Sequence, residues 1–139
     1  TGYTRPFLPA ASTPRERFVN QCSRLAKETA AMKLVRGIVR EEKVHAVVQE
    51  LTRIGAPGVT VTHVTGQGEK MRTATYRGVK YPALLPMCAL EVIADDNCAD
   101  DIARTIVDTA HTGHKGDGHV FVIQVEGAYA IRTRWRNVA

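Results

Sequence analysis

Residues 32–64 read MKLVRGIVREEKVHAVVQELTRIGAPGVTVTHV and contain two strand patterns on either side of one helix pattern. The apolar run at 32–40 includes several β-branched residues, which is typical of a strand. In 42–54, valine, leucine and isoleucine recur at spacings of three and four residues, which predicts an amphipathic helix ended by Gly55. Residues 59–64 alternate valine with threonine or histidine, so we expect a half-buried strand there.

A second strand, helix and strand pattern follows a long polar stretch at 66–85. The helix of this half begins at side chains whose oxygens can accept hydrogen bonds from the free N–H groups of its first turn. The turn after this helix is rich in glycine. The expected elements are a strand at 90–94, a helix capped by Asp95, Asp96 and Asn97 with an apolar face reaching Ala110, a strand at 120–125 and a short fifth strand at 130–133.

This order of elements predicts an α+β fold, the ferredoxin-like βαββαβ sandwich. In that architecture an antiparallel sheet carries both helices on one face. The opposite face has to be covered, and association with further copies of the chain is the simplest cover. A polar stretch as long as 66–85 is rare inside a compact domain, so it indicates either a functional loop or a missed element.

Length and charge indicate one domain at 32–139 after an extension at 1–31. The chain has 139 residues and a formal net charge of +5. The extension contains five basic and two acidic residues, so the domain carries only +2. This near balance argues against nucleic acid as a partner. The extension contains prolines and lacks a regular apolar pattern at its start, so we expect it to be disordered or partly helical.

Simple motif counts exclude other classes of protein. No apolar run reaches the ~18–20 residues that a membrane helix needs. The cysteines Cys22, Cys88 and Cys98 show no close pairing pattern, so we expect reduced thiols and a cytoplasmic protein. No Gly-x-Ser-x-Gly or Walker sequence is present, so we do not expect an enzyme.

Three segments are candidates for binding an anion. The Gly66-Gln-Gly68 motif lets backbone N–H groups turn toward an anion, but a flexible hinge explains it equally well. The run TGHKGDGH at 112–119 has the composition of a phosphate-binding loop, with an ordinary helix-to-strand turn as the alternative. The arginines of 131–136 suit phosphate groups or form an exposed basic tail.

Two further functions stay open at this point. The histidines His111, His114 and His119 would serve a metal-tolerance protein, although no carboxylate or cysteine stands beside them at a ligand-like spacing. Slow nucleotide hydrolysis is the other alternative, with Asp117 as the acidic residue of the glycine-rich run.

Residues 32–133 resemble the PII signal-transduction superfamily, whose members are homotrimers that bind adenine nucleotides between subunits. The resemblance rests on three motifs in order, GVTVTHVTGQG (58–68), YRGVKY (76–81) and TGHKGDGHVFV (112–122). The second motif lies in the T-loop, the family's long mobile loop, and the third is its B-loop. The resemblance implies a homotrimer of the βαββαβ fold with a long T-loop.

The resemblance also implies roles for the matching residues. In the family, these positions surround the adenine, the ribose and the phosphates, and the T-loop contacts partners or effectors. The implied nucleotide site consists of Thr60, Gly66, Gly68, Glu91, Gly116, Asp117, Gly118, His119 and Arg132. The implied T-loop contacts are Lys70, Arg72, Arg77, Lys80 and Tyr81, the last at the place of a tyrosine that some members modify.

Departures from the family pattern change the expected ligands. His119 stands in place of a lysine and Ala130 in place of an arginine, so we expect ADP or AMP to compete well with ATP. Met87 replaces a lysine, and a glutamine after the Gly-x-Gly is missing. Those two family residues serve 2-oxoglutarate and its metal, so we expect a smaller anion, bicarbonate first, as the second ligand.

These expectations describe a non-enzymatic regulator that senses ADP, AMP or ATP together with an anion and controls a target through the T-loop. One divergent branch of the superfamily has similar losses and is associated with carboxysome or inorganic-carbon genes. The expected target is therefore a bicarbonate transporter or a carboxysome-related protein. We expect neither a cofactor nor a metal ion.

Overall fold

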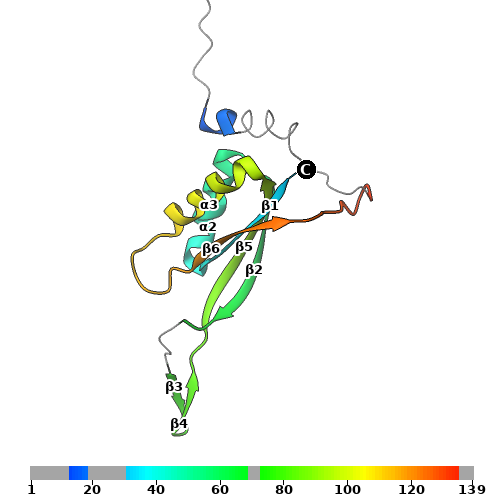
Figure 1. Ribbon diagram of the computed structural model, residues 1–139. Helices are drawn as coiled ribbons and strands as arrows, with labels where there is room; N and C mark the ends of the chain where they lie inside the picture. Colours follow the sequence, from blue (N-terminus) through cyan, green and yellow to red (C-terminus); the bar gives the residue numbers. More distant parts are fainter. Residues whose placement is uncertain (1–12, 19–30, 69–72, 135–139) are drawn as a thin grey trace, which may run out of the picture.

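The computed structural model describes residues 13–18, 31–68 and 73–134, and it confirms the ferredoxin-like α+β fold (Figure 1). Two helices lie on one face of an antiparallel sheet. The elements are β1 (Met32–Arg40), η1 (Glu41–Lys43), α2 (Val44–Ile54), β2 (Val59–Gly66), β3 (Thr73–Tyr76), β4 (Val79–Pro82), β5 (Leu85–Asp95), α3 (Asp96–Ala110) and β6 (His119–Val125).

The main sheet has four strands in the order β2-β5-β1-β6, and each pair of adjacent strands is antiparallel. Val35 of β1 pairs with Val92 of β5 and with Val122 of β6. Because side chains alternate along a strand, this register puts Val35, Val39 and Val92 on the helix-covered face. The residues between them lie on the other face, which we call the open face.

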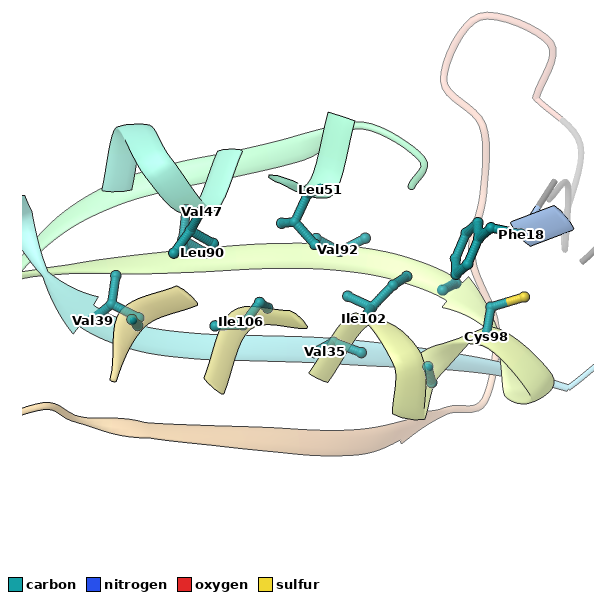
Figure 2. Packing of buried hydrophobic residues seen from close by; sticks show 13 residues of the cluster. Phe18, Val35, Val39, Val47, Leu51, Leu90, Val92, Cys98, Ile102 and Ile106 are labelled. Atoms are coloured by element: carbon teal, nitrogen blue, oxygen red, sulfur yellow. The ribbon is translucent and has the colours of Figure 1, made fainter. Parts of the chain in front are cut away.

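The core lies between the sheet and the two helices (Figure 2). Gly37 of β1 makes room for α3, because a Cβ atom there would lie 3.0 Å from Cγ2 of Ile106. Each large side chain buried in this layer contributes about 1.5–3 kcal/mol of hydrophobic stabilisation. The fully buried side chains include Val35, Val39, Leu90 and Val92 from the sheet, Val47 and Leu51 from α2, and Ile102 and Ile106 from α3.

The helix ends follow the sequence expectations only in part. Gly55 ends α2 in the left-handed conformation, with φ of 83°, as expected. The expected cap of α3 is wrong, because no side chain caps its first turn. Asp96 instead pairs with Nζ of Lys33 at 2.5 Å and donates its backbone N–H to the carbonyl of Ala31. Of the three expected capping residues, Asp96 is thus engaged by a cation from β1, and Asp95 occupies the N-cap position without a side-chain cap bond.

The polar stretch after β2 contains a β-hairpin that the sequence analysis missed. β3 and β4 pair with each other and project from the end of the main sheet (Figure 1). Their turn uses Arg77 and Gly78, both with positive φ, which is the turn geometry that matches strand twist. The strand after the hairpin also begins earlier than expected, at Leu85. The fifth strand expected at 130–133 is wrong, since residues 131–133 form a turn.

Part of the extension packs on the domain. Residues 14–18 are helical, and Thr13 and Glu16 exchange hydrogen bonds between side chain and backbone N–H, as in a capping box. Phe18 is buried against the core near Cys98 (Figure 2). Cys98 is disulfide-bonded, which contradicts the expected set of reduced thiols, whereas Cys88 is a free thiol. The remainder of residues 1–31 lies outside the described residues, apart from Ala31.

Within the described ranges, no helix combines the length and the apolar character needed to cross a membrane.

Candidate functional site

The glycine-rich loop before β6 and the end of β2 lie at the same end of the sheet. Met87 of β5 lies between them on the open face, paired with Val64 of β2 and Arg40 of β1. A Cβ atom on Gly118 would lie 3.5 Å from Cε of Met87, and one on Gly66 would lie 4.0 Å from its Cγ. One apolar side chain therefore separates the base of the hairpin from the loop.

Asp117 organises this loop from within. Its Oδ2 accepts hydrogen bonds from the backbone N–H groups of Thr112 at 2.9 Å and Gly113 at 3.0 Å. Its Oδ1 accepts a hydrogen bond from the Thr112 hydroxyl. The Nδ1 of His111 stands 3.9 Å from Oδ2. The carboxylate thus joins the first residues of the loop to its last ones.

Arg40 at the end of β1 anchors the loop to the sheet. Its Nε donates to Oδ1 of Asp117 at 3.2 Å, and its Nη2 donates to the carbonyl oxygen of Lys115 at 2.6 Å. Arg40 is not among the site residues expected from the sequence. An available signal was its spacing from Arg36, because side chains four positions apart in a strand share a face, here the one opposite the buried valines.

Hydrogen bonds keep the Asp117 side chain ionised. The hydroxyl and then the backbone N–H of Thr112 hold the pKa of Asp117 well below its usual range, with further lowering by Arg40 and Gly113. A carboxylate engaged by this many donors shapes the loop and is a poor general base. This arrangement argues against the hydrolase alternative, which needs Asp117 as an acid or base.

The loop backbone requires glycine. Gly113, Gly116 and Gly118 all have φ between 82° and 95°, and a Cβ on Gly118 would lie 1.7 Å from the carbonyl oxygen of Ile38. Residues with a left-handed backbone conformation in such a loop allow successive N–H groups to converge on an anion. His119 follows at the start of β6, exposed and stacked on Phe121 with ring centroids 6.1 Å apart.

Thr60 and Glu91 form a second part of the candidate site. They are direct partners in the β2–β5 register and lie on the open face. Glu91 is paired with Arg36, its partner on β1. Arg36 is a second arginine that the sequence analysis missed. The structure therefore places Thr60, Glu91 and Arg36 in one row across three neighbouring strands.

A single chain does not assemble all the expected nucleotide-binding residues. His119 pairs with Ile38 and Val125 with Met32, so β6 runs from the loop to the opposite end of the sheet. The segment carrying Arg132 leaves from that opposite end (Figure 1). Arg132 is therefore far along the molecule from the loop of its own chain.

The described T-loop residues lie on the hairpin. Arg77, Lys80 and Tyr81 are exposed, and Cζ of Arg77 lies 5.5 Å from the ring centroid of Tyr76. This contact is a cation–π arrangement at the tip of the hairpin. Lys70 and Arg72 lie outside the described residues.

The structure places a possible metal-ligand group elsewhere than expected. In the described part of the chain, the His, Cys and carboxylate atoms that meet within 4.8 Å belong to Glu41, His63 and Cys88. His111, His114 and His119 are not in this group. Burial, and to a smaller extent the charge of Glu41, raise the pKa of the Cys88 thiol.

Known proteins resemble this chain in sequence and in fold. A model of the family described as "Nitrogen regulatory protein P-II" matches residues 32–135. Nitrogen regulatory protein GlnK2 of Haloferax mediterranei is 40% identical over 104 residues, covering 73% of this chain and 85% of that protein. Nitrogen regulatory protein P-II of Haemophilus influenzae is 40% identical over 108 residues, covering 76% of this chain and 96% of that protein.

Solved structures of PII proteins have a similar fold. Arabidopsis thaliana PII bound to citrate matches with a TM-score of 0.63 and 29% identity, over 76% of this chain and 88% of that one. A B. subtilis GlnK–ATP complex has the same fold, with a TM-score of 0.63 and 23% identity, over 78% of this chain and 95% of that one.

The fold is a small α+β domain with a projecting hairpin after β2 and a glycine-rich loop before β6. The chain belongs to the nitrogen regulatory protein P-II family of signal-transduction proteins.

Proposed function

We propose that the protein is a non-enzymatic sensor of adenine nucleotides that controls a protein target through its β3–β4 hairpin. The observation that carries this proposal is the loop at 112–118, shaped by Asp117 and anchored by Arg40. Its glycine backbone and the exposed Lys115 and His119 suit a polyphosphate. Because the loop and the hairpin base both approach Met87, a ligand in the loop can bias the hairpin.

We propose a homotrimer as the functional unit. The open face carries exposed apolar side chains at Ile93, Phe121 and Ile123, and burying them between copies is favourable. We propose that association also supplies what one chain lacks, with Arg132 of one copy placed beside the loop of another. The nucleotide site proposed from the family resemblance is then formed between subunits.

The proposed nucleotides are ADP and AMP, with ATP as a competitor. His119 is a weaker cation than lysine at neutral pH, and Ala130 removes a further positive charge from the position of the family's arginine. Both changes reduce attraction for the outer phosphates. ADP and AMP, which have fewer outer phosphates, therefore lose less binding affinity than ATP does.

The proposed second ligand is a small anion, bicarbonate first. Met87 is buried between the loop and the hairpin base and offers no cation for a dicarboxylate. A bicarbonate transporter or a carboxysome-related protein is the target that this ligand suggests.

Calorimetric titration of the full chain with AMP, ADP and ATP tests the nucleotide proposal. We expect each nucleotide to bind, with ADP or AMP at least as tight as ATP. Glycerol phosphate serves as a control for simple anion binding. Absence of binding at millimolar nucleotide would refute the proposal, and so would hydrolysis of ATP at a rate that Asp117→Ala abolishes.

A further inference from the structure

Three potential metal ligands from three elements converge at the β2 edge of the sheet, on its helix-covered side. Nδ1 of His63 lies 3.3 Å from Oε1 of Glu41 and 3.5 Å from Sγ of Cys88. All three ligand atoms lie within 4.8 Å of one another. The group joins η1, β2 and β5, and its members are up to 47 positions apart in the chain.

The spacing agrees with one tetrahedral ion. Zinc binds sulfur at about 2.3 Å and nitrogen or oxygen at about 2.0–2.1 Å. Tetrahedral angles then place the nitrogen about 3.3 Å from the oxygen and about 3.6 Å from the sulfur. The two distances at His63 match these separations, so zinc could enter with little movement of the side chains.

Hydrogen bonding explains this group less well. Both close contacts of His63 fall on the same ring nitrogen, Nδ1. A neutral Nδ1 either carries a proton and donates to Glu41, or lacks it and accepts from the thiol. It cannot make a full hydrogen bond of both kinds at once, so the two contacts would have to share one N–H as a weaker, bifurcated bond. A metal ion satisfies both at once.

The same point separates this group from a catalytic triad. In a triad, the histidine uses one ring nitrogen toward the nucleophile and the other toward the carboxylate. Here the thiol and the carboxylate both lie next to the same ring nitrogen. Three ligand atoms grouped in this way are typical of a metal site.

The surroundings suit a divalent ion with an open position. A thiolate and a carboxylate balance two positive charges, and imidazole completes the donor set that zinc prefers. Cys88 is buried, while the side chain of His63 is 80% exposed and that of Glu41 is 48% exposed. Water can therefore occupy the fourth position and the ion can enter from solvent.

The scaffold holds two ligands in fixed positions. His63 and Cys88 are direct partners in the β2–β5 ladder, and Cys88 also pairs with Val39 of β1. Glu41 comes two residues after Val39, at the first position of η1. We propose that Glu41, His63 and Cys88 form a Zn²⁺-binding site with three protein ligands and an exchangeable fourth position.

This site is separate from the proposed nucleotide site. Arg40 and Met87 lie on the open face, whereas their chain neighbours Glu41 and Cys88 converge on the opposite side of the sheet. The zinc proposal therefore does not depend on nucleotide binding. Its test uses the metal alone.

The experiment titrates the full chain with Co²⁺ as a spectroscopic substitute for Zn²⁺, without nucleotide. It is run under an inert atmosphere and without reductant, so that Cys88 stays reduced and the disulfide of Cys98 stays intact. We expect one Co²⁺ per chain with a thiolate-to-cobalt charge-transfer band, and loss of that band when Zn²⁺ is added. Cys88→Ser should remove the band. His63→Gln and Glu41→Gln should weaken Zn²⁺ binding by about tenfold or more.

The matched controls are Glu42→Gln and His45→Gln, exposed residues of the same kinds in neighbouring positions. Both should bind metal as the wild type does. Because His63 and Glu41 are exposed, their variants should fold even if Cys88→Ser does not, and circular dichroism checks this. Absence of a thiolate band in the wild type, or a band that survives Cys88→Ser, would overturn the proposal. Equal losses in the control variants would do the same.

Discussion

The Arg40 guanidinium contacts the Asp117 carboxylate, with Nε 3.2 Å from Oδ1, although 77 positions separate them in the chain. This contact joins the end of β1 to the loop before β6. Arg40 also binds the carbonyl of Lys115, so one side chain holds both halves of the loop. The shape of the proposed phosphate site thus depends on a residue outside the glycine-rich motif.

Removing either partner should loosen the loop and weaken nucleotide binding. We expect Arg40→Gln and Asp117→Asn each to lower ADP affinity by about tenfold, and the double variant to lose little more than either single one. Calorimetry on the wild type, the two single variants and the double variant completes this double-mutant cycle. Arg53→Gln, which breaks an exposed ion pair with Glu50 on α2, is the control and should bind normally. Fully additive losses would contradict the coupling.

Asp117 should also make stability sensitive to acid. Its pKa is lowered in the folded protein, so its contribution is present above the unfolded value of about 3.9 and is lost as pH falls toward the folded pKa. Urea unfolding measured from about pH 5 to about pH 2 should show a steeper loss for the wild type than for Asp117→Asn. Parallel curves would show that Asp117 is not the group responsible.

Gly118 should tolerate no side chain. A Cβ there would overlap the Ile38 carbonyl oxygen at 1.7 Å, and its φ of 95° already disfavours other residues. We expect Gly118→Ala to lower the free energy of unfolding by about 2 kcal/mol or more. Gly58→Ala is the control, because nothing lies within 4 Å of its added Cβ. Chemical denaturation compares the two, and equal stabilities would refute the steric argument.

The open face should be the surface of self-association. We expect Ile93→Asp to convert the proposed trimer to smaller species, because a carboxylate would be buried between copies. Val107→Asp changes an apolar residue of comparable exposure on α3 and should leave the assembly intact. Sedimentation velocity distinguishes the outcomes. A wild-type monomer, or the same assembly in both variants, would contradict the proposed interface.

Bicarbonate should raise the affinity for ADP or AMP. By linkage, nucleotide then raises the affinity for bicarbonate by the same factor. The measurement is a nucleotide titration at fixed pH and ionic strength with bicarbonate exchanged for chloride. Identical affinities in both buffers, or a gain from 2-oxoglutarate instead, would defeat the proposal.

Local patterns predicted much of the fold. The strand at 32–40 agrees with β1 over its whole length, and the helix expected at 42–54 agrees closely with η1 and α2. Gly55 ends that helix as expected. Alternation and helical spacing recur within a few residues, so they can be recognised before any tertiary contact is known.

The failures lie where a distant residue or a turn decides the outcome. The cap of α3 was wrong: Asp95 at the N-cap position makes no side-chain cap bond, and Asp96 pairs with Lys33 of β1 instead. The β3–β4 hairpin was missed because its exposed strands lack an apolar stripe and its turn begins with Arg77. Neither segment carries a strong local signal.

The sequence by itself determined the order of the main-sheet strands and the two helices, the family and the glycine-rich loop, because neighbouring residues carry each of these signals. The tertiary structure decided which side chains meet. Arg40 reaches Asp117, and Glu41 and His63 approach Cys88, only through the antiparallel register of β1, β2, β5 and β6. Register is a property of paired strands, and the packing of the whole sheet against both helices selects it.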